Sequence, residues 1–270
     1  MSPTSPTSPI RVGVFGASGR MGATVCEMVV GDPDLELVAA VDPHHAGLDL
    51  RQAIGLDVPG LMISPNTEGL ADTAVEVMVD FTVLQAAKQN LSWCAEHGIH
   101  AVAGTTGFDA DDYAELGKRF SRSNCFIAPN FAIGAVLVIR FAELAAPYFE
   151  TAEIIELHHD QKVDAPSGTA MMTADRMAGA SDQWTKDPTK KEVLKGARGG
   201  KGPANIRRHS VRLRGLVAHQ EVLLGTTGQS LTIRHDSYDR SSFMPGVLLA
   251  VKSVAGHPGL TVGLDTYLGL

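Results

Sequence analysis

The feature that most constrains the fold is a glycine-rich turn at residues 16–22, with the sequence G-A-S-G-R-M-G. An apolar stretch, Ile10 to Phe15, precedes the turn and predicts a strand, and apolar residues at helical spacing follow it. A second apolar stretch, Leu35 to Val41, ends at Asp42, about 20 residues beyond the turn. This strand–turn–helix–strand order with a terminal acid is typical of a dinucleotide-binding unit.

Each glycine of the turn has a distinct role in such a unit. Gly16 permits the tight turn, Gly19 lets the backbone approach a pyrophosphate, and Gly22 lets the helix pack close to the strand. The pattern is G-x-x-G-x-x-G rather than the commoner G-x-G-x-x-G, so the prediction rests on the strand before it, the helix after it and Asp42.

Strands and helices continue to alternate up to residue 131. This alternation predicts an α/β fold with a Rossmann-like, doubly wound parallel sheet that binds its ligand at the carboxyl ends of the strands. Strands are predicted at Val75–Phe81, Ile99–Ala103 and Cys125–Ala128, with helices around 84–95 and 113–120. The polar or glycine-rich segments after these strands should meet beside the glycine turn and form the nicotinamide site; they contain Phe81, Gly104, Thr105, Thr106, Ala128, Pro129, Asn130 and Phe131.

The pattern changes after Phe131 and predicts a second, α+β domain with an antiparallel or mixed sheet. A helix at 133–144 is apolar nearly all round, which predicts a buried helix. We further predict a strand at 153–157, a helix at 167–178, an exposed loop at 181–208 with a solvated basic cluster, and strands at 209–214, 218–224 and 229–235.

The last 30 residues contain a helical stretch, 243–254, and a short apolar strand, 260–264, which resemble the first domain. We therefore expect a discontinuous dinucleotide-binding domain, 10–130 and 241–270, around a second domain, 131–240. Residues 1–9 repeat Ser-Pro-Thr and are expected to form a disordered tail.

A second chemically rich stretch, Glu156 to Ala170, reads E-L-H-H-D-Q-K-V-D-A-P-S-G-T-A. A strand end delivers two histidines and a lysine, and a helix start follows within a few residues. The N–H groups and the dipole of a helix start favour a carboxylate or phosphate. His158, His159 and Lys162 beside such a start predict a pocket that binds an anionic substrate and donates a proton.

Composition excludes several classes of function. A net charge of -7 argues against general nucleic-acid binding, and no apolar run has the length of a membrane span. Cys26, Cys94 and Cys125 lack metal-binding spacing and are expected to be reduced and buried, which favours the cytoplasm. No metal site is predicted.

The 156–170 stretch resembles the signature of 4-hydroxy-tetrahydrodipicolinate reductases, also called dihydrodipicolinate reductases, of the diaminopimelate route to lysine. The resemblance extends from Ile10 over nearly the whole chain. It includes G-A-S-G-R-M-G at 16–22, V-D-F-T at 79–82, G-T-T-G-F at 104–108, A-P-N-F-A-I-G at 128–134 and G-L-V-A-H-Q-E-V at 215–222.

The resemblance implies NADH or NADPH as cofactor, a cyclic dicarboxylate as substrate and a homotetramer. It also implies that the domain 131–240 binds the substrate and makes the tetramer contacts. It implies that His158 is the general acid/base and Lys162 a proton donor that also faces the substrate. His159, Gly168 and Thr169 would bind substrate carboxylates. The cofactor would be lined by Gly16, Ala17, Ser18, Gly19, Arg20, Met21, Asp42, Gly104, Thr105, Thr106, Ala128, Pro129, Asn130 and Phe131.

One departure from the family pattern concerns cofactor choice. Some members carry an arginine directly after the ribose acid, which favours the 2′-phosphate of NADPH, whereas this chain has Pro43 followed by two histidines. An anionic Asp42 accepts hydrogen bonds from ribose hydroxyls and repels a phosphate, while Arg20 could reach one. We predict that NADH is used at least as well as NADPH, with both accepted.

Two other functions would share part of this sequence pattern. A dehydrogenase of a different small amino or oxo acid would share the nucleotide-binding half but should lack the H-H-x-x-K and S-G-T block. A non-catalytic redox sensor would need neither a proton donor nor a carboxylate-binding helix start. The combination of His158, Lys162 and Thr169 disfavours both.

Overall fold

The computed structural model describes residues 8–270, and the backbone separates into two compact units. The first takes the chain up to Phe131 together with Phe243–Leu270, and the second is Ala132–Ser242. Of the predicted tail, only Ser8 and Pro9 lie within the described residues, and both are exposed. No helix within residues 8–270 is both long and apolar enough to cross a membrane.

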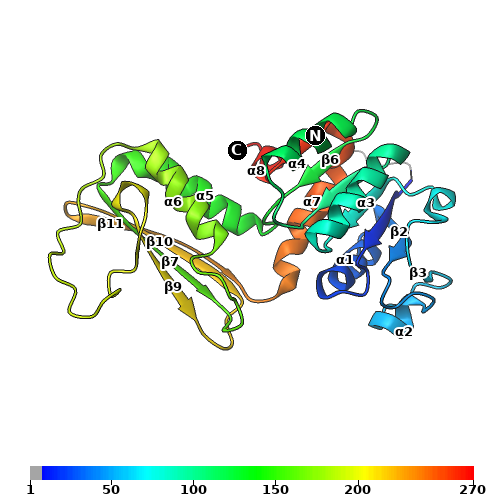
Figure 1. Ribbon diagram of the computed structural model, residues 1–270, viewed down its shortest axis with the longest axis horizontal. Helices are drawn as coiled ribbons and strands as arrows, with labels where there is room; N and C mark the ends of the chain where they lie inside the picture. The colour runs from blue at the N-terminus through cyan, green and yellow to red at the C-terminus, as the bar shows by residue number, and fades with distance from the viewer. Residues whose placement is uncertain (1–7) are drawn as a thin grey trace. The chain divides into compact units, whose positions relative to one another are not determined.

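The first unit is built on a seven-stranded sheet in which every pairing is parallel (Figure 1). Its order is β12-β6-β5-β4-β1-β2-β3. The strands are β1 Ile10–Phe15, β2 Leu35–Val41, β3 Ile63–Ser64, β4 Val77–Asp80, β5 His100–Ala103, β6 Cys125–Ile127 and β12 Leu260–Val262. The order reverses between β1 and β4, where a doubly wound sheet opens a crevice at the carboxyl ends of its strands.

Helices connect the strands of this sheet. They are α1 Arg20–Gly31, α2 Leu50–Ile54, α3 Leu84–His97, α4 Ala110–Arg119, α7 Met244–Ser253 and α8 Asp265–Leu268, with short 3-10 turns at Leu70–Thr73 and Val254–Gly256. α1 packs with α7, and α3 packs with α4. α3 ends at His97, and its C-cap Gly98 has a φ of 69°, a left-handed conformation that favours glycine. The predicted doubly wound fold is confirmed.

The strands and helices of this unit bury an apolar core that includes Phe15, Met78 and Leu91. Cys94 and Cys125 belong to this core, and Cys26 lies on the buried face of α1. All three thiols are free and buried, as predicted. Burial raises the pKa of Cys26 to about 12, so its thiol stays protonated and unreactive.

The second unit is a five-stranded mixed sheet with two helices packed against it (Figure 1). Its order is β11-β10-β7-β9-β8, and β7 pairs parallel with β9 and antiparallel with β10. The elements are α5 Ile133–Ala145, β7 Thr151–His158, α6 Gly168–Ala180, β8 Gly200–Lys201, β9 Arg207–Arg212, β10 Ala218–Thr226 and β11 Gln229–Ser237, with 3-10 turns at Ala146–Tyr148 and Pro203–Asn205 and a further 3-10 turn, Arg240–Phe243, at the end of the unit.

The layer between this sheet and its helices changes from apolar to polar along β7. Ile154 is fully buried and packs in one cluster with Val222 of β10 and Ala174 of α6. Because side chains alternate along a strand, Glu156 and His158 point to the same face as Ile154. The carboxyl end of β7 therefore brings charged groups to the edge of the core beside the start of α6.

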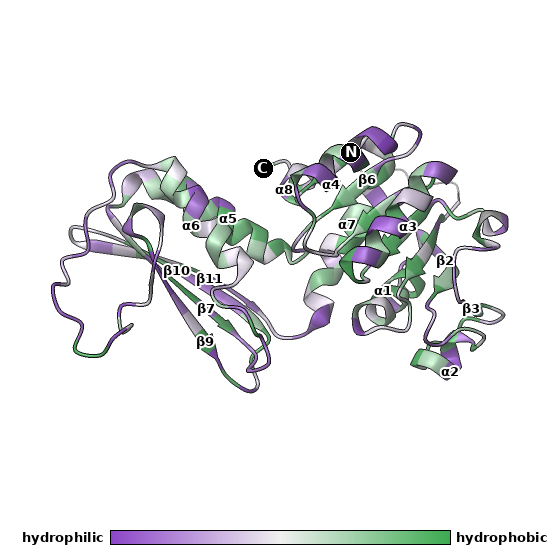
Figure 2. Ribbon diagram, viewed as in Figure 1, coloured by the Kyte–Doolittle hydropathy of each residue, from purple (hydrophilic) through white to green (hydrophobic). Residues whose placement is uncertain are grey.

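Several predictions about this unit were wrong. α5 is hydrophobic over most of its surface (Figure 2) but is not buried all round, since Phe141 is 48% exposed and Leu144 55% exposed. One face of α5, which includes Val138 and Ala142, is enough to cover the sheet.

The basic cluster predicted to be solvated is mostly paired. Arg198 and Arg207 both contact Asp187, and Arg208 is only 8% exposed. Of the four residues in the cluster, Arg198, Lys201, Arg207 and Arg208, Lys201 alone is exposed. The predicted loop also ends earlier than expected, because β8 and the start of β9 lie within 181–208.

Boundary errors elsewhere are small. The predicted strand Val75–Phe81 shortens to β4, and residues 43–74, for which no element was predicted, contain α2, β3 and a 3-10 turn. The predicted strands 218–224 and 229–235 are each two residues longer in the structure, because β10 and β11 pair from Ala218 with Ser237 to Thr226 with Gln229.

Candidate active site

The glycine turn of the first unit has the geometry that a pyrophosphate requires. Gly16 has a φ of 69°, a conformation that favours glycine. Gly19 is the N-cap of α1 without a side-chain cap, and the first turn of α1 holds no acidic residue. A Cβ on Gly22 would collide with the carbonyl oxygen of Gly16. The helix start is thus close to the strand, with neither a capping side chain nor a carboxylate competing for an anion.

Asp42 lies at the end of β2 and is only 4% exposed. One carboxylate oxygen accepts hydrogen bonds from Ser18 N at 3.1 Å and Ser18 Oγ at 2.5 Å, and the other accepts one from His44 N at 3.0 Å. Burial alone would raise its pKa, but these hydrogen bonds outweigh burial and lower it. Asp42 is therefore ionised at neutral pH and ties its own loop to the glycine turn.

His45 adds a contact that the sequence did not predict. Its Nδ1 lies 2.7 Å from Ser18 Oγ. Because the Ser18 hydroxyl donates its proton to Asp42, the oxygen accepts from His45. The side chain of His45 is exposed, yet it supports the turn.

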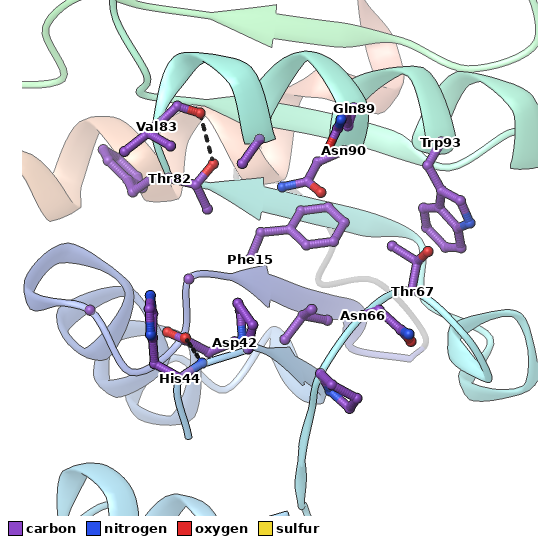
Figure 3. A pocket seen from close by; sticks show the side chains of 17 residues that line it. Phe15, Asp42, His44, Asn66, Thr67, Thr82, Val83, Gln89, Asn90 and Trp93 are labelled. Atoms are coloured by element: carbon purple, nitrogen blue, oxygen red, sulfur yellow. Dashed lines mark hydrogen bonds between the residues drawn. The ribbon is translucent and has the colours of Figure 1, made fainter. Parts of the chain in front are cut away.

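A cavity of about 760 Å³ lies beside the glycine turn and the ends of β1, β2 and β4 (Figure 3). Apolar and amide side chains alternate around it, which suits a planar heterocycle with polar edges. Its lining residues are Phe15, Gly16, Gly19, Val41, Asp42, Pro43, His44, Pro65, Asn66, Thr67, Phe81, Thr82, Val83, Ala86, Gln89, Asn90 and Trp93. Figure 3 places the amide of Asn90 and the ring of Phe15 close to one another within it.

Four of the predicted cofactor residues line this cavity, namely Gly16, Gly19, Asp42 and Phe81. Ser18 adjoins it through its hydrogen bonds to Asp42. Ala17 is buried, and Arg20, the first residue of α1, is exposed. Sequence reasoning missed Asn66, Gln89, Asn90 and Trp93, which carry no pattern of their own and come together only through the sheet.

Met21 lies in α1, and the other predicted cofactor residues lie at the ends of β4, β5 and β6. Asp80 links the first two of these segments. Asp80 is 1% exposed and accepts hydrogen bonds from Thr82, Asn90 and Thr105. A Cβ on Gly104 would collide with the ring of Phe81. The structure therefore brings the predicted 81–82 and 104–106 segments together.

Aromatic contacts join the third segment to the first. The ring of Phe81 lies 5.5 Å from that of Phe131, centroid to centroid. Ala128 N donates to the carbonyl of Ala103 at 3.0 Å, while Pro129 is exposed and Asn130 is partly buried. Thr106 is exposed beside the buried Thr105.

In the second unit, His158 is the last residue of β7, and its Nδ1 lies 2.5 Å from Glu156 Oε2. Arg212 of β9 grips the same carboxylate with two hydrogen bonds of 2.9 Å each. Burial would raise the pKa of Glu156, but hydrogen bonds from His158, Arg212 and Ser210 outweigh it and lower the pKa to about 2. Glu156 is fully buried and ionised at neutral pH.

Lys162 lies on the loop that follows β7. Lys162 Nζ contacts both carboxylate oxygens of Asp164, at 2.7 and 3.0 Å, and Arg212 also donates to the Asp164 carbonyl at 2.7 Å. Arg212 thus links the lysine loop to the Glu156–His158 pair. His159 is exposed beside them.

α6 begins directly after this loop. Ser167 is its N-cap and accepts a hydrogen bond from Ala170 N at 3.2 Å. Gly168 and Thr169 are the first residues of the helix, and no acidic residue lies in its first turn. The predicted helix start and its composition suit a carboxylate. Sequence reasoning missed Arg212, because its role depends on a strand pairing 56 positions along the chain.

Two family models match nearly the whole chain. Residues 10–131 match the N-terminus of dihydrodipicolinate reductase, and residues 134–268 match its C-terminus. The chain belongs to the dihydrodipicolinate reductase family. It is an NAD(P)H-dependent oxidoreductase of the diaminopimelate route to lysine, which confirms the predicted family, activity and cofactors and sets aside the other dehydrogenases and the sensor.

Individual relatives agree. The chain is 51% identical over 268 residues to the 4-hydroxy-tetrahydrodipicolinate reductase of Nocardia farcinica, covering 97% of this chain and 99% of the relative. It is 49% identical over 267 residues to that of Corynebacterium aurimucosum, with the same coverage. A dipicolinate-bound dihydrodipicolinate reductase from Paenisporosarcina sp. TG-14 is 40% identical with a TM-score of 0.84, covering 96% of this chain and 99% of that one.

A more distant structure shows only the fold. The amine dehydrogenase of Mycobacterium smegmatis is 15% identical, with a TM-score of 0.61 over 97% of both chains. Among residues 8–270, no group of His, Cys, Asp or Glu side chains is arranged to hold a metal ion.

Proposed function

We propose that His158 and Lys162 are the catalytic residues of this reductase and that 4-hydroxy-tetrahydrodipicolinate is bound at the start of α6. A bound nicotinamide would supply a hydride from its C4 atom, and the second unit would supply the proton. His158 is suited to this because Glu156 holds its Nδ1 and leaves Nε2 as the exchangeable position. Lys162 adds positive charge where negative charge develops on the ring or its carboxylate.

The substrate carboxylates have donors in the same segment. We assign one carboxylate to Gly168 and Thr169, through the backbone N–H and the hydroxyl, at the positive end of the α6 dipole. We assign the other to His159, which is exposed next to His158. Lys162 is held by Asp164 at 2.7 Å, so a substrate carboxylate would compete with Asp164 for the ammonium group.

The first unit would hold the cofactor. The N–H groups at the start of α1 would bind the pyrophosphate, the 760 Å³ cavity the adenosine half, and the segments around Phe81, Gly104 and Phe131 the nicotinamide. Asp42 is ionised and would accept from ribose hydroxyls, which favours NADH, while Arg20 is exposed and available to a 2′-phosphate. We therefore keep the proposal that both cofactors are used, NADH at least as well.

The two units would accordingly act as a dinucleotide-binding domain and a substrate-binding domain. We propose that the second also makes the contacts of a homotetramer, and that the enzyme works in the cytoplasm. Exposed apolar side chains on the second unit, such as Phe141, Leu144 and Leu231, support an assembly.

The observation that carries the proposal is the Glu156–His158–Arg212 cluster beside a carboxylate-ready helix start. The test is oxidation of NADH and of NADPH, with the substrate generated in place by the preceding synthase. Wild type should turn over with both cofactors, and His158→Gln should lower kcat by about 10²- to 10⁴-fold, because it removes the general acid.

NADH binding serves as the control for this variant. It should be unchanged in His158→Gln, and a pyridine dicarboxylate should tighten NADH binding in wild type. Full activity in a folded His158→Gln protein would remove His158 from the chemistry.

A further inference from the structure

Glu156 is a charged side chain with no exposed surface, and its carboxylate is surrounded by donors of this chain. Oε2 contacts His158 Nδ1 at 2.5 Å and Arg212 Nη1 at 2.9 Å, and Oε1 contacts Arg212 Nη2 at 2.9 Å. Burying an ion pair offers little or no stability over an apolar residue of similar volume. If position 156 served only packing, an apolar side chain such as isoleucine or valine would serve as well.

The cluster follows from the register of the sheet. Glu156 lies opposite Ser210 and His158 opposite Arg212 in the parallel pairing of β7 with β9. Alternation along β7 places Glu156 and His158 on one face, so the carboxylate reaches along the strand to the imidazole. Arg212 approaches from the neighbouring strand and fixes the carboxylate plane by its two parallel hydrogen bonds.

The protonation states follow from these partners. An ionised carboxylate can only accept hydrogen bonds, and the pKa of Glu156 is lowered to about 2 despite its burial. Nδ1 of His158 must therefore carry a proton in the neutral as well as the charged imidazole. Nε2 is left as the atom that gains and loses the proton.

We propose that Glu156 is the positioning residue of this active site, acting through His158: it fixes the Nδ1–H tautomer, aims Nε2 away from the sheet and offsets the charge of the imidazolium, while Arg212 holds Glu156 in place. This rests on the proposed role of His158 as general acid. The arrangement is a carboxylate–histidine pair with an arginine brace, in which only His158 touches substrate.

Other charges near His158 are paired among themselves. Lys162 pairs with Asp164 on the loop after β7, and Arg214 pairs with Asp160 at 2.8 Å. Glu156 is thus the carboxylate in direct contact with the imidazole, and Arg212 is a cation that shares this carboxylate. Removing the charge of Glu156 leaves Arg212 to destabilise the imidazolium.

The test compares Glu156→Gln with Glu153→Gln. Glu153 lies on the same strand and also holds a histidine, His209, at 2.6 Å, but is outside the proposed site. Glu156→Gln should lower kcat by about 10- to 100-fold with a small change in KM, as expected for a partner that orients a reactive histidine. Glu153→Gln should leave both unchanged.

The pH dependence of activity distinguishes a positioning role of Glu156 from a purely structural one. Activity that needs protonated His158 is lost as pH rises, and without the negative neighbour this loss should move to lower pH. An unchanged profile in Glu156→Gln would overturn the proposal, even if kcat fell. If His158→Gln keeps full activity, the proposed function fails instead, whatever Glu156→Gln does.

A measurement on the unaltered protein removes dependence on the variant's folding. ¹⁵N NMR of His158 above its titration range distinguishes the two neutral tautomers. We expect the Nδ1–H form in wild type and a mixture in Glu156→Gln. A wild-type imidazole protonated on Nε2 would overturn the proposal.

Discussion

Asp42 in the first unit and Glu156 in the second are both buried carboxylates with a lowered pKa, yet they are held in different ways. Asp42 accepts from the backbone and hydroxyl of Ser18 and from the backbone of His44. Glu156 accepts from the charged guanidinium of Arg212 and from an imidazole. The first site is made mainly of backbone geometry, and the second mainly of charged side chains brought together by strand pairing.

The two sites are therefore sensitive to different kinds of substitution. In the glycine turn, added atoms do harm because the backbone segments already touch. In the β7 cluster, removing a charge does harm because its partners stay buried without it.

Removing the ammonium group of Lys162 should have the largest effect on activity. Lys162→Ala should lower kcat by about 10²- to 10⁴-fold, since it removes a proton donor and a positive charge from the reaction. NADH affinity, measured by fluorescence titration, should be nearly unchanged. An equal loss of cofactor binding would assign Lys162 a structural role.

Low pH should reduce the free energy of unfolding, because Glu156 becomes protonated. Its pKa falls from 4.5 to about 2 on folding, so its stabilising contribution is complete above pH 4.5 and is lost as pH falls from 4.5 toward 2. The size is about 3 kcal/mol, at about 1.36 kcal/mol per pKa unit. Urea unfolding of wild type and Glu156→Gln at several pH values measures it; an equal acid loss in both proteins would contradict the assignment.

Adding one methyl group to the glycine turn should damage the first unit. The Cβ of Gly22→Ala would meet the Gly16 carbonyl oxygen, so α1 must move away from β1. We expect a loss of about 1–3 kcal/mol of unfolding free energy and weaker NADH binding. Gly31→Ala, at the end of the same helix with nothing near its Cβ, is the matched control and should leave NADH binding intact.

The smallest effect concerns cofactor choice. Asp42→Ala should weaken NADH binding more than NADPH binding. The substitution removes an acceptor for the ribose hydroxyls and also a charge that repels the 2′-phosphate. Loss of the Ser18 and His44 hydrogen bonds should weaken both cofactors somewhat. Dissociation constants for the two cofactors decide the matter, and an unchanged ratio would take Asp42 out of the ribose site.

Much of the first site could be predicted from the sequence because its determinants are local. Gly16, Gly19 and Gly22 lie within one turn, and the end of β2 places Asp42 where the spacing predicted. The amide side chains of the cavity, such as Asn66 and Gln89, could not be predicted. They come from segments without periodicity that meet only when the parallel sheet forms.

The sequence alone determined the family, the doubly wound sheet, and the approach of His158 and Lys162 to a helix start, because all of these depend on short-range order and spacing. Only the tertiary structure decided the partners of Glu156. Arg212 is 56 residues away, and a strand pairing shifted by one residue would turn its side chain to the other face of the sheet. Long-range register, which no local pattern encodes, brings the charges together.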